Sequence, residues 1–115
     1  MKNIVVLSTS LRNNSNSAKL AEAFADGAEA AGHAVERISL KNKEMHFCIG
    51  CLVCQKTGKC VLADDVQAIT EKVRDADIVV FATPIYYYEM SGQMKTLIDR
   101  MNALYTADYR FRSVY

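Results

Sequence analysis

The sequence predicts a three-layer α/β domain built around a parallel sheet. Apolar, β-branched runs alternate along the chain with segments whose apolar residues recur at helical spacing. Residues 4–7 and 77–82 have the largely apolar pattern of strands that are covered on both faces. The chain has 115 residues, of which 50% are hydrophobic, and that is enough for one domain with its own core.

The first strand, residues 4–7, is continuously apolar and is therefore expected in the middle of the sheet. A helix is expected to begin near residues 15–17, where serine and asparagine side chains can cap its first turn, and to stop at Gly32. Its expected inner face consists of Leu20, Ala21, Phe24 and Ala28.

A second strand follows, in which polar residues interrupt the apolar ones, as is typical of an exposed edge strand. Its apolar residues are Val35, Ile38 and Leu40. Asp64 and Asp65 are expected to cap the next helix, because acidic side chains are favourable at a helix N-terminus. The inner face of that helix should consist of Val66, Ile69 and Val73.

The third strand, residues 77–82, returns to the buried pattern, and a third helix is expected to start near Ser91. The expected inner face of this helix is Met94, Leu97, Ile98, Met101 and Leu104. Residues 111–115 resemble the beginning of a further strand. We therefore expect residues 1–115 to be the N-terminal part of a single domain, truncated after the third helix and lacking its C-terminal strands. The hydrophobic sheet edge left unpaired would favour a homo-oligomer.

Charge and composition favour a small-molecule partner. Fourteen basic residues against 13 acidic ones leave a net charge of +1 with no basic run, a pattern that predicts neither nucleic acid nor a membrane as partner. The opening residues lack the apolar length of a signal peptide, and no run approaches the length of a membrane span. The expected location is cytoplasmic.

The first strand leads into a segment rich in hydroxyl groups, residues 8–17, which we call the hydroxyl loop. A phosphate monoester needs many donors that converge on its oxygens, and charge-assisted hydrogen bonds to it are the strong ones. The candidate phosphate-binding residues are Ser10, Arg12, Ser15, Asn16 and Ser17. The alternative is an ordinary polar loop that caps a helix.

The third strand leads into a second loop, residues 83–88, which we call the tyrosine loop. Its candidate residues, which could wall one face of a flat ring, are Pro84, Ile85, Tyr86 and Tyr87. A tyrosine-rich rim used for subunit contact is the alternative, and both uses are compatible. Because the carboxyl ends of parallel strands meet at one sheet edge, the two loops together predict a site for flavin mononucleotide (FMN).

The four cysteines lie within residues 48–60, which we call the cysteine segment. Cys48, Cys51 and Cys54 have the three-residue spacing of ferredoxin-type ligands, and Cys60 could close the coordination of a [4Fe–4S] cluster. Tetrahedral zinc, a redox disulfide and unligated thiols are the alternatives, although zinc sites usually present two separated pairs.

These motifs resemble those of a known family. The run from Ser10 to Ser17 and the run from Pro84 to Tyr87, in this order of strands and helices, resemble the NADPH-dependent FMN reductase branch of the flavodoxin-like superfamily. The cysteine segment further resembles that of the iron-sulfur flavoproteins in this branch.

The resemblance implies a flavodoxin-like fold in which the hydroxyl loop binds the FMN phosphate and the tyrosine loop contacts the isoalloxazine ring. It implies that Cys48, Cys51, Cys54 and Cys60 carry a [4Fe–4S] cluster. The expected protein is an FMN-dependent NAD(P)H oxidoreductase that passes electrons to an unknown acceptor, directly or through the cluster. The alternative is a non-catalytic flavin and iron-sulfur electron-transfer protein.

Overall fold

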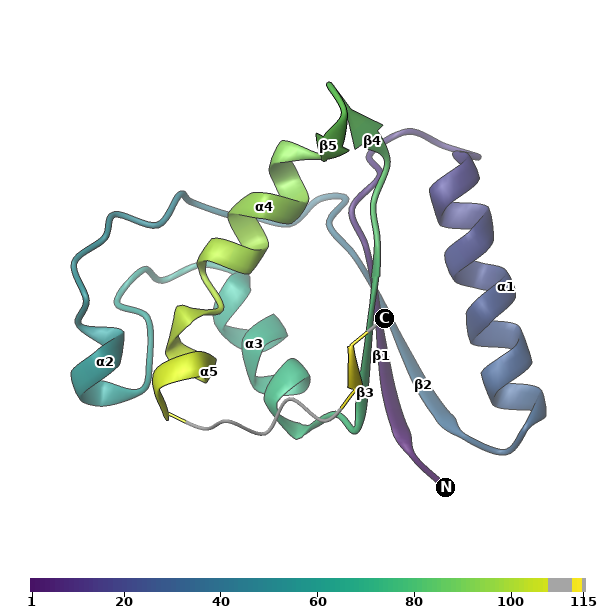
Figure 1. Ribbon diagram of the computed structural model, residues 1–115, viewed down its shortest axis with the longest axis horizontal. Helices are drawn as coiled ribbons and strands as arrows, with labels where there is room; N and C mark the ends of the chain where they lie inside the picture. Colours follow the sequence, from purple (N-terminus) through teal and green to yellow (C-terminus); the bar gives the residue numbers. More distant parts are fainter. Residues whose placement is uncertain (108–112, 115) are drawn as a thin grey trace.

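The computed structural model of the protein describes residues 1–107 and 113–114. A parallel sheet lies between α1 on one face and α3 and α4 on the other (Figure 1). This is the predicted three-layer α/β arrangement. The elements are β1 (Asn3–Ser8), α1 (Asn16–Ala30), β2 (Ala34–Ser39), α2 (Cys54–Thr57), α3 (Val66–Asp75), β3 (Ile78–Ala82), β4 (Ile85–Tyr86), β5 (Glu89–Met90), α4 (Gly92–Asp99), α5 (Asn102–Ala107) and β6 (Ser113–Val114).

The sheet has the strand order β2-β1-β3-β6, and each of its pairs is parallel. Strand β1 therefore lies in the interior and β2 at an edge, as the apolar patterns predicted. The β3 edge is paired with Ser113–Val114, which confirms part of the strand expected at 111–115. Phe111, Arg112 and Tyr115 lie outside the described residues.

The two faces of the sheet are buried differently. Val5, Leu7 and Val79 pack with side chains of α3 and α4, and the predicted inner faces of these helices are largely confirmed. On the other face, Ala21 and Ala25 of α1 pack against the sheet. Small residues at these positions let the helix approach the strands closely.

The predicted inner face of α1 was wrong at two positions. Leu20 is 73% exposed and Phe24 is 40% exposed. Residues four apart share one side of a helix, so Leu20 and Phe24 form a stripe that lies about 100° from the stripe of Ala21 and Ala25. Helical periodicity predicts that one face of the helix is apolar, but it does not determine which of two adjacent apolar stripes contacts the sheet. In α1 the stripe of alanines does so.

Helix termini follow the sequence signals closely. Ser15 caps α1 and Ser91 caps α4, each with its hydroxyl oxygen accepting a backbone N–H, and α1 ends just before Gly32, whose φ is +91°. Asp65 occupies the capping position of α3 without making the capping bond, whereas Asp64 Oδ1 accepts the N–H of Val66.

The expected third helix is divided into α4 and α5 by the residues between Asp99 and Asn102. The short helix α2 within the cysteine segment and the hairpin β4–β5 were not predicted. Among the described residues, no helix has the length and apolar character needed to cross a membrane.

Candidate functional site

The two candidate loops start side by side at the carboxyl edge of the sheet. The Thr9 N–H donates to the carbonyl oxygen of Ala82 at 3.1 Å, which joins the ends of β1 and β3. Thr9 Oγ1 lies 3.3 Å from Ser91 Oγ, and the Ser91 N–H donates to Thr83 Oγ1 at 3.0 Å. Thr9 and Ser91 are buried and Thr83 is half-buried, and this hydroxyl network joins the hydroxyl loop, the tyrosine loop and the start of α4. Sequence reasoning missed it, because its contacts join residues far apart in the chain.

The hydroxyl loop presents its groups at two depths. Ser10 and Ser15 are buried, with 3% and 4% of their surface exposed, and the Ser15 hydroxyl accepts the N–H of Ala18 at 3.1 Å. Ser17 Oγ lies 3.5 Å from Ser15 Oγ. Arg12 is exposed and forms no ion pair among the described residues. Serine hydroxyls, a helix N-terminus and an unpaired guanidinium make a donor set that fits a phosphate monoester.

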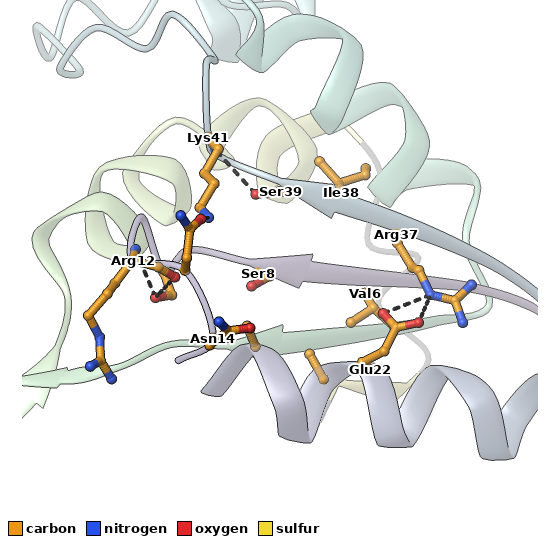
Figure 2. Close-up of a pocket in the computed structure, with 13 residues that line it drawn as sticks. Val6, Ser8, Arg12, Asn14, Glu22, Arg37, Ile38, Ser39 and Lys41 are labelled. Carbon is orange, nitrogen blue, oxygen red and sulfur yellow. Dashed lines mark hydrogen bonds and ion pairs between the residues drawn. The ribbon is translucent and has the colours of Figure 1, made fainter. Parts of the chain in front are cut away.

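A cavity of about 500 Å³ adjoins this loop on the β2 side (Figure 2). Its walls come from β1, β2, the start of α1 and the hydroxyl loop, and they include the predicted residues Ser10 and Arg12. Ser39, the last residue of β2, and Lys41, just beyond it at the same sheet edge, also line the cavity and were not predicted. The tyrosine loop does not line this cavity, so the cavity is one flank of the predicted site and does not join the two loops.

The second arginine of the cavity, Arg37, is held by carboxylates of α1. Its guanidinium donates to Glu22 at 2.9 Å, Asp26 at 3.0 Å and Glu29 at 2.7 Å. The hydrogen bond to Glu29 raises the pKa of Arg37 and lowers the pKa of Glu29. Because these carboxylates neutralise Arg37, Arg12 is the better placed cation for an incoming anion.

The tyrosine loop forms a two-stranded hairpin. Ile85 pairs with Met90 and Tyr86 with Glu89, so Tyr87 and Tyr88 make the turn. Both turn residues are 92% exposed, and their φ angles are 50° and 68°. Bulky residues rarely adopt positive φ, and backbone strain of this kind clusters at binding sites. The strain and exposure fit a surface that is used for binding.

The hairpin strain gives a testable expectation. The double variant Tyr87→Asn, Tyr88→Gly should raise the free energy of unfolding by about 1–2 kcal/mol, because Asn-Gly is the preferred pair where both turn residues have positive φ. Urea denaturation measures the gain. Tyr86→Asn, outside the turn, should give no gain, and an unchanged double variant would show that the tyrosine turn is not strained.

The cysteine segment places its thiols at different depths. Cys48 and Cys51 are exposed, whereas Cys54 and Cys60 are half-buried. Among residues 1–107, no group of three or more His, Cys, Asp or Glu side chains is gathered to hold a metal ion. Four thiols within one short segment have the ligand chemistry of an iron-sulfur cluster, but their sulfurs are not converged in this structure.

The strand order and the paired loops at the carboxyl edge of β1 and β3 define an α/β protein of the flavodoxin-like class. The NAD(P)H:quinone oxidoreductase from Methanothermobacter marburgensis has the same fold, with a TM-score of 0.70, 23% identity, and coverage of 87% of this chain and 53% of that one. The family model for NADPH-dependent FMN reductase matches residues 2–114. The chain belongs to the NADPH-dependent FMN reductase family, a family of oxidoreductases.

Curated relatives carry a narrower name. An iron-sulfur flavoprotein of Archaeoglobus fulgidus is 37% identical over 101 residues, which cover 88% of this chain and 46% of the relative. An iron-sulfur flavoprotein of Methanocaldococcus jannaschii is 36% identical over 101 residues, covering 88% of this chain and 52% of the relative. The chain therefore spans about half the length of the curated relatives it matches.

Proposed function

We propose that the protein is an FMN-dependent NAD(P)H oxidoreductase whose flavin lies across the carboxyl ends of β1 and β3. The joining of the two candidate loops by the Thr9–Ala82 and Thr9–Ser91 contacts carries this proposal. When bound, FMN supplies the redox chemistry, accepting a hydride from NAD(P)H and passing electrons on to an acceptor. The protein's own residues bind and orient it.

The phosphate end is assigned to the hydroxyl loop, with Ser10, Arg12, Ser15, Asn16 and Ser17 as its donors. The buried serines fix the loop, and the α1 N-terminus adds backbone N–H groups and a favourable dipole. The unpaired charge of Arg12 supplies the charge-assisted hydrogen bond that a phosphate favours.

The ring end is assigned to the tyrosine loop, where Pro84, Ile85, Tyr86 and Tyr87 would frame the isoalloxazine. Ile85 is 74% exposed and Tyr86 is 51% exposed, so this apolar surface is available to a flat ring. Exposed aromatic residues also suit a subunit contact, and we propose a homo-oligomer that buries the same rim.

The cysteine segment is assigned to a [4Fe–4S] cluster with Cys48, Cys51, Cys54 and Cys60 as ligands. The compact spacing and the iron-sulfur flavoprotein relatives support this assignment. Assembly would have to bring the exposed thiols of Cys48 and Cys51 toward those of Cys54 and Cys60.

The test is anaerobic purification followed by quantification of flavin and iron per chain and stopped-flow mixing with NADPH. We expect bound FMN that is rapidly bleached by NADPH. Bound flavin that stays oxidised would identify a non-catalytic electron carrier instead. Protein that remains colourless after reconstitution with excess FMN would refute the proposal.

Arg12→Ala should weaken FMN binding by about tenfold to a hundredfold, because a hydrogen bond to a charged group contributes about 1.5–3 kcal/mol. Fluorescence titration measures the change. Riboflavin lacks the phosphate, so its affinity should be the same in both proteins. Lys2→Ala removes an equal charge before β1, at the opposite end of that strand, and serves as control. Equal losses for FMN and riboflavin would contradict the assignment of Arg12 to the phosphate.

A further inference from the structure

Two side chains outside the cysteine segment donate hydrogen bonds to its sulfurs. Arg100 Nε–H donates to Cys60 Sγ at 3.2 Å, and Asn102 Nδ2–H donates to Cys54 Sγ at 3.3 Å. The donors come from the junction of α4 and α5, and α5 packs against α2, which begins at Cys54 (Figure 1). The two half-buried cysteines, Cys54 and Cys60, are thus the two that accept hydrogen bonds from these side chains.

The orientation of the Arg100 guanidinium is fixed on every side. It donates to Asp64 Oδ2 at 2.7 Å and Oδ1 at 3.0 Å, to the carbonyl of His46 at 2.9 Å and to the carbonyl of Leu62 at 3.3 Å. The side chains of Arg100 and Asp64 are fully buried. Together with the bond to Cys60, these contacts engage all five guanidinium N–H donors.

Cys60 is held from its backbone as well. Its carbonyl oxygen accepts a hydrogen bond from Gln67 Nε2 at 2.8 Å. The sulfur of Cys60 therefore faces a cation whose orientation is set by Asp64 and by the carbonyl oxygens of His46 and Leu62, all of which flank the cysteine segment.

Building on the proposed function, we propose that Arg100 and Asn102 are positioning residues that raise the reduction potential of a cluster ligated by Cys54 and Cys60. Adding one electron to an iron-sulfur cluster places more negative charge on its ligand sulfurs. N–H donors and a nearby positive charge stabilise that reduced state more than the oxidised state. The one-electron couple therefore shifts to a higher potential when both donors are present.

The test uses Asn102, because removing Arg100 would leave a buried charge unpaired. Asn102 is half-buried in the first turn of α5. Asn102→Leu removes the N–H donor, and Asn102→Asp replaces it with an anion that a helix N-terminus tolerates well. Gln55→Leu, an equally apolar change beside Cys54 on the exposed side of α2, is the matched control.

The measurement is a redox titration of the anaerobically reconstituted protein, followed by electron paramagnetic resonance of the reduced cluster. The midpoint potential should fall in the order wild type, Asn102→Leu, Asn102→Asp, with Gln55→Leu equal to wild type. Equal midpoint potentials in all four proteins would overturn the proposed role of these donors, but the assignment of the cluster to the cysteines would be unaffected. A wild type that binds flavin but no iron would overturn the cluster assignment and this inference together.

Discussion

Asp64→Asn is expected to lower the free energy of unfolding by about 3–5 kcal/mol, the usual cost of removing one partner of a buried ion pair. Asp64 and Arg100 are both fully buried in their side chains, and Arg100 Nη1 lies 2.7 Å from Asp64 Oδ2. Asp64 also accepts backbone N–H groups of His46 at 2.8 Å and Val66 at 3.1 Å. The substitution would leave the guanidinium charge buried without its counterion. A domain of this size is stable by only about 5–15 kcal/mol, so urea denaturation should show a large shift.

The matched control is Asp99→Asn, which breaks the exposed pair with Lys95 on α4 and should cost about 0.5 kcal/mol or less. The double variant Asp64→Leu, Arg100→Met should recover only part of the single-variant loss. It removes the unpaired buried charge, but backbone groups of His46, Leu62 and Val66 lose their hydrogen-bond partners. A loss of about 1 kcal/mol or less for Asp64→Asn would contradict the buried pair.

The same pair predicts how stability depends on pH. Burial raises the pKa of Asp64, but hydrogen bonds from Arg100, His46 and Val66 outweigh it and hold the pKa below its ordinary value. Because the pKa of Asp64 is lower in the folded state, the contribution of Asp64 to stability is fully present at any pH above the pKa of the unfolded state, about 4. It is lost as the pH falls through the folded value. Acid titration of unfolding should therefore be steeper for the wild type than for Asp64→Asn.

Local signals in the sequence predicted much of the fold. The continuous apolar runs located β1 and β3, and the serines before apolar periods located the starts of α1 and α4 within a residue or two. Capping and burial of this kind depend on a few neighbouring residues, so one stretch of sequence contains the whole signal. The errors in the predicted inner face of α1 arose because tertiary packing determines which residues contact the sheet. Leu20 and Ala21 both had helical spacing, and only the contact with the sheet selected the alanine.

The site was less predictable, because its contacts are non-local. The hydroxyl and tyrosine loops were identified from their residue types, but nothing local to Thr9 indicates Ser91 as its neighbour. Likewise, nothing local to Arg100 indicates its contacts with Cys60 and Asp64, forty and thirty-six positions away. The hairpin was missed for a related reason, since Tyr87 and Tyr88 are poor residues for a turn with positive φ.

Ser91→Ala is expected to lower the free energy of unfolding by about 2–3 kcal/mol. Loss of a helix cap costs about 1 kcal/mol, and loss of two further buried hydroxyl contacts adds a similar amount or more. Ser91 is fully buried, and its oxygen accepts the N–H of Met94 at 3.3 Å while lying 3.3 Å from Thr9 Oγ1 and 3.2 Å from Thr83 Oγ1. The residue therefore caps α4 and also joins the two loops.

The chain contains a control that separates these roles. Ser15 caps α1 in the same way, accepting the N–H of Ala18 at 3.1 Å, and it does not join the loops. Ser15→Ala should therefore lower the free energy of unfolding by about 1 kcal/mol, the usual loss when a helix cap is removed. The difference between the losses of the two variants in urea denaturation measures the contribution of the contacts between the loops. Equal losses would mean that Thr9 and Thr83 gain nothing from Ser91. The hydroxyl of Ser91 would then not help to hold the two loops together, and the geometric support for a shared flavin site would rest on the hydrogen bond from the Thr9 N–H to the carbonyl oxygen of Ala82.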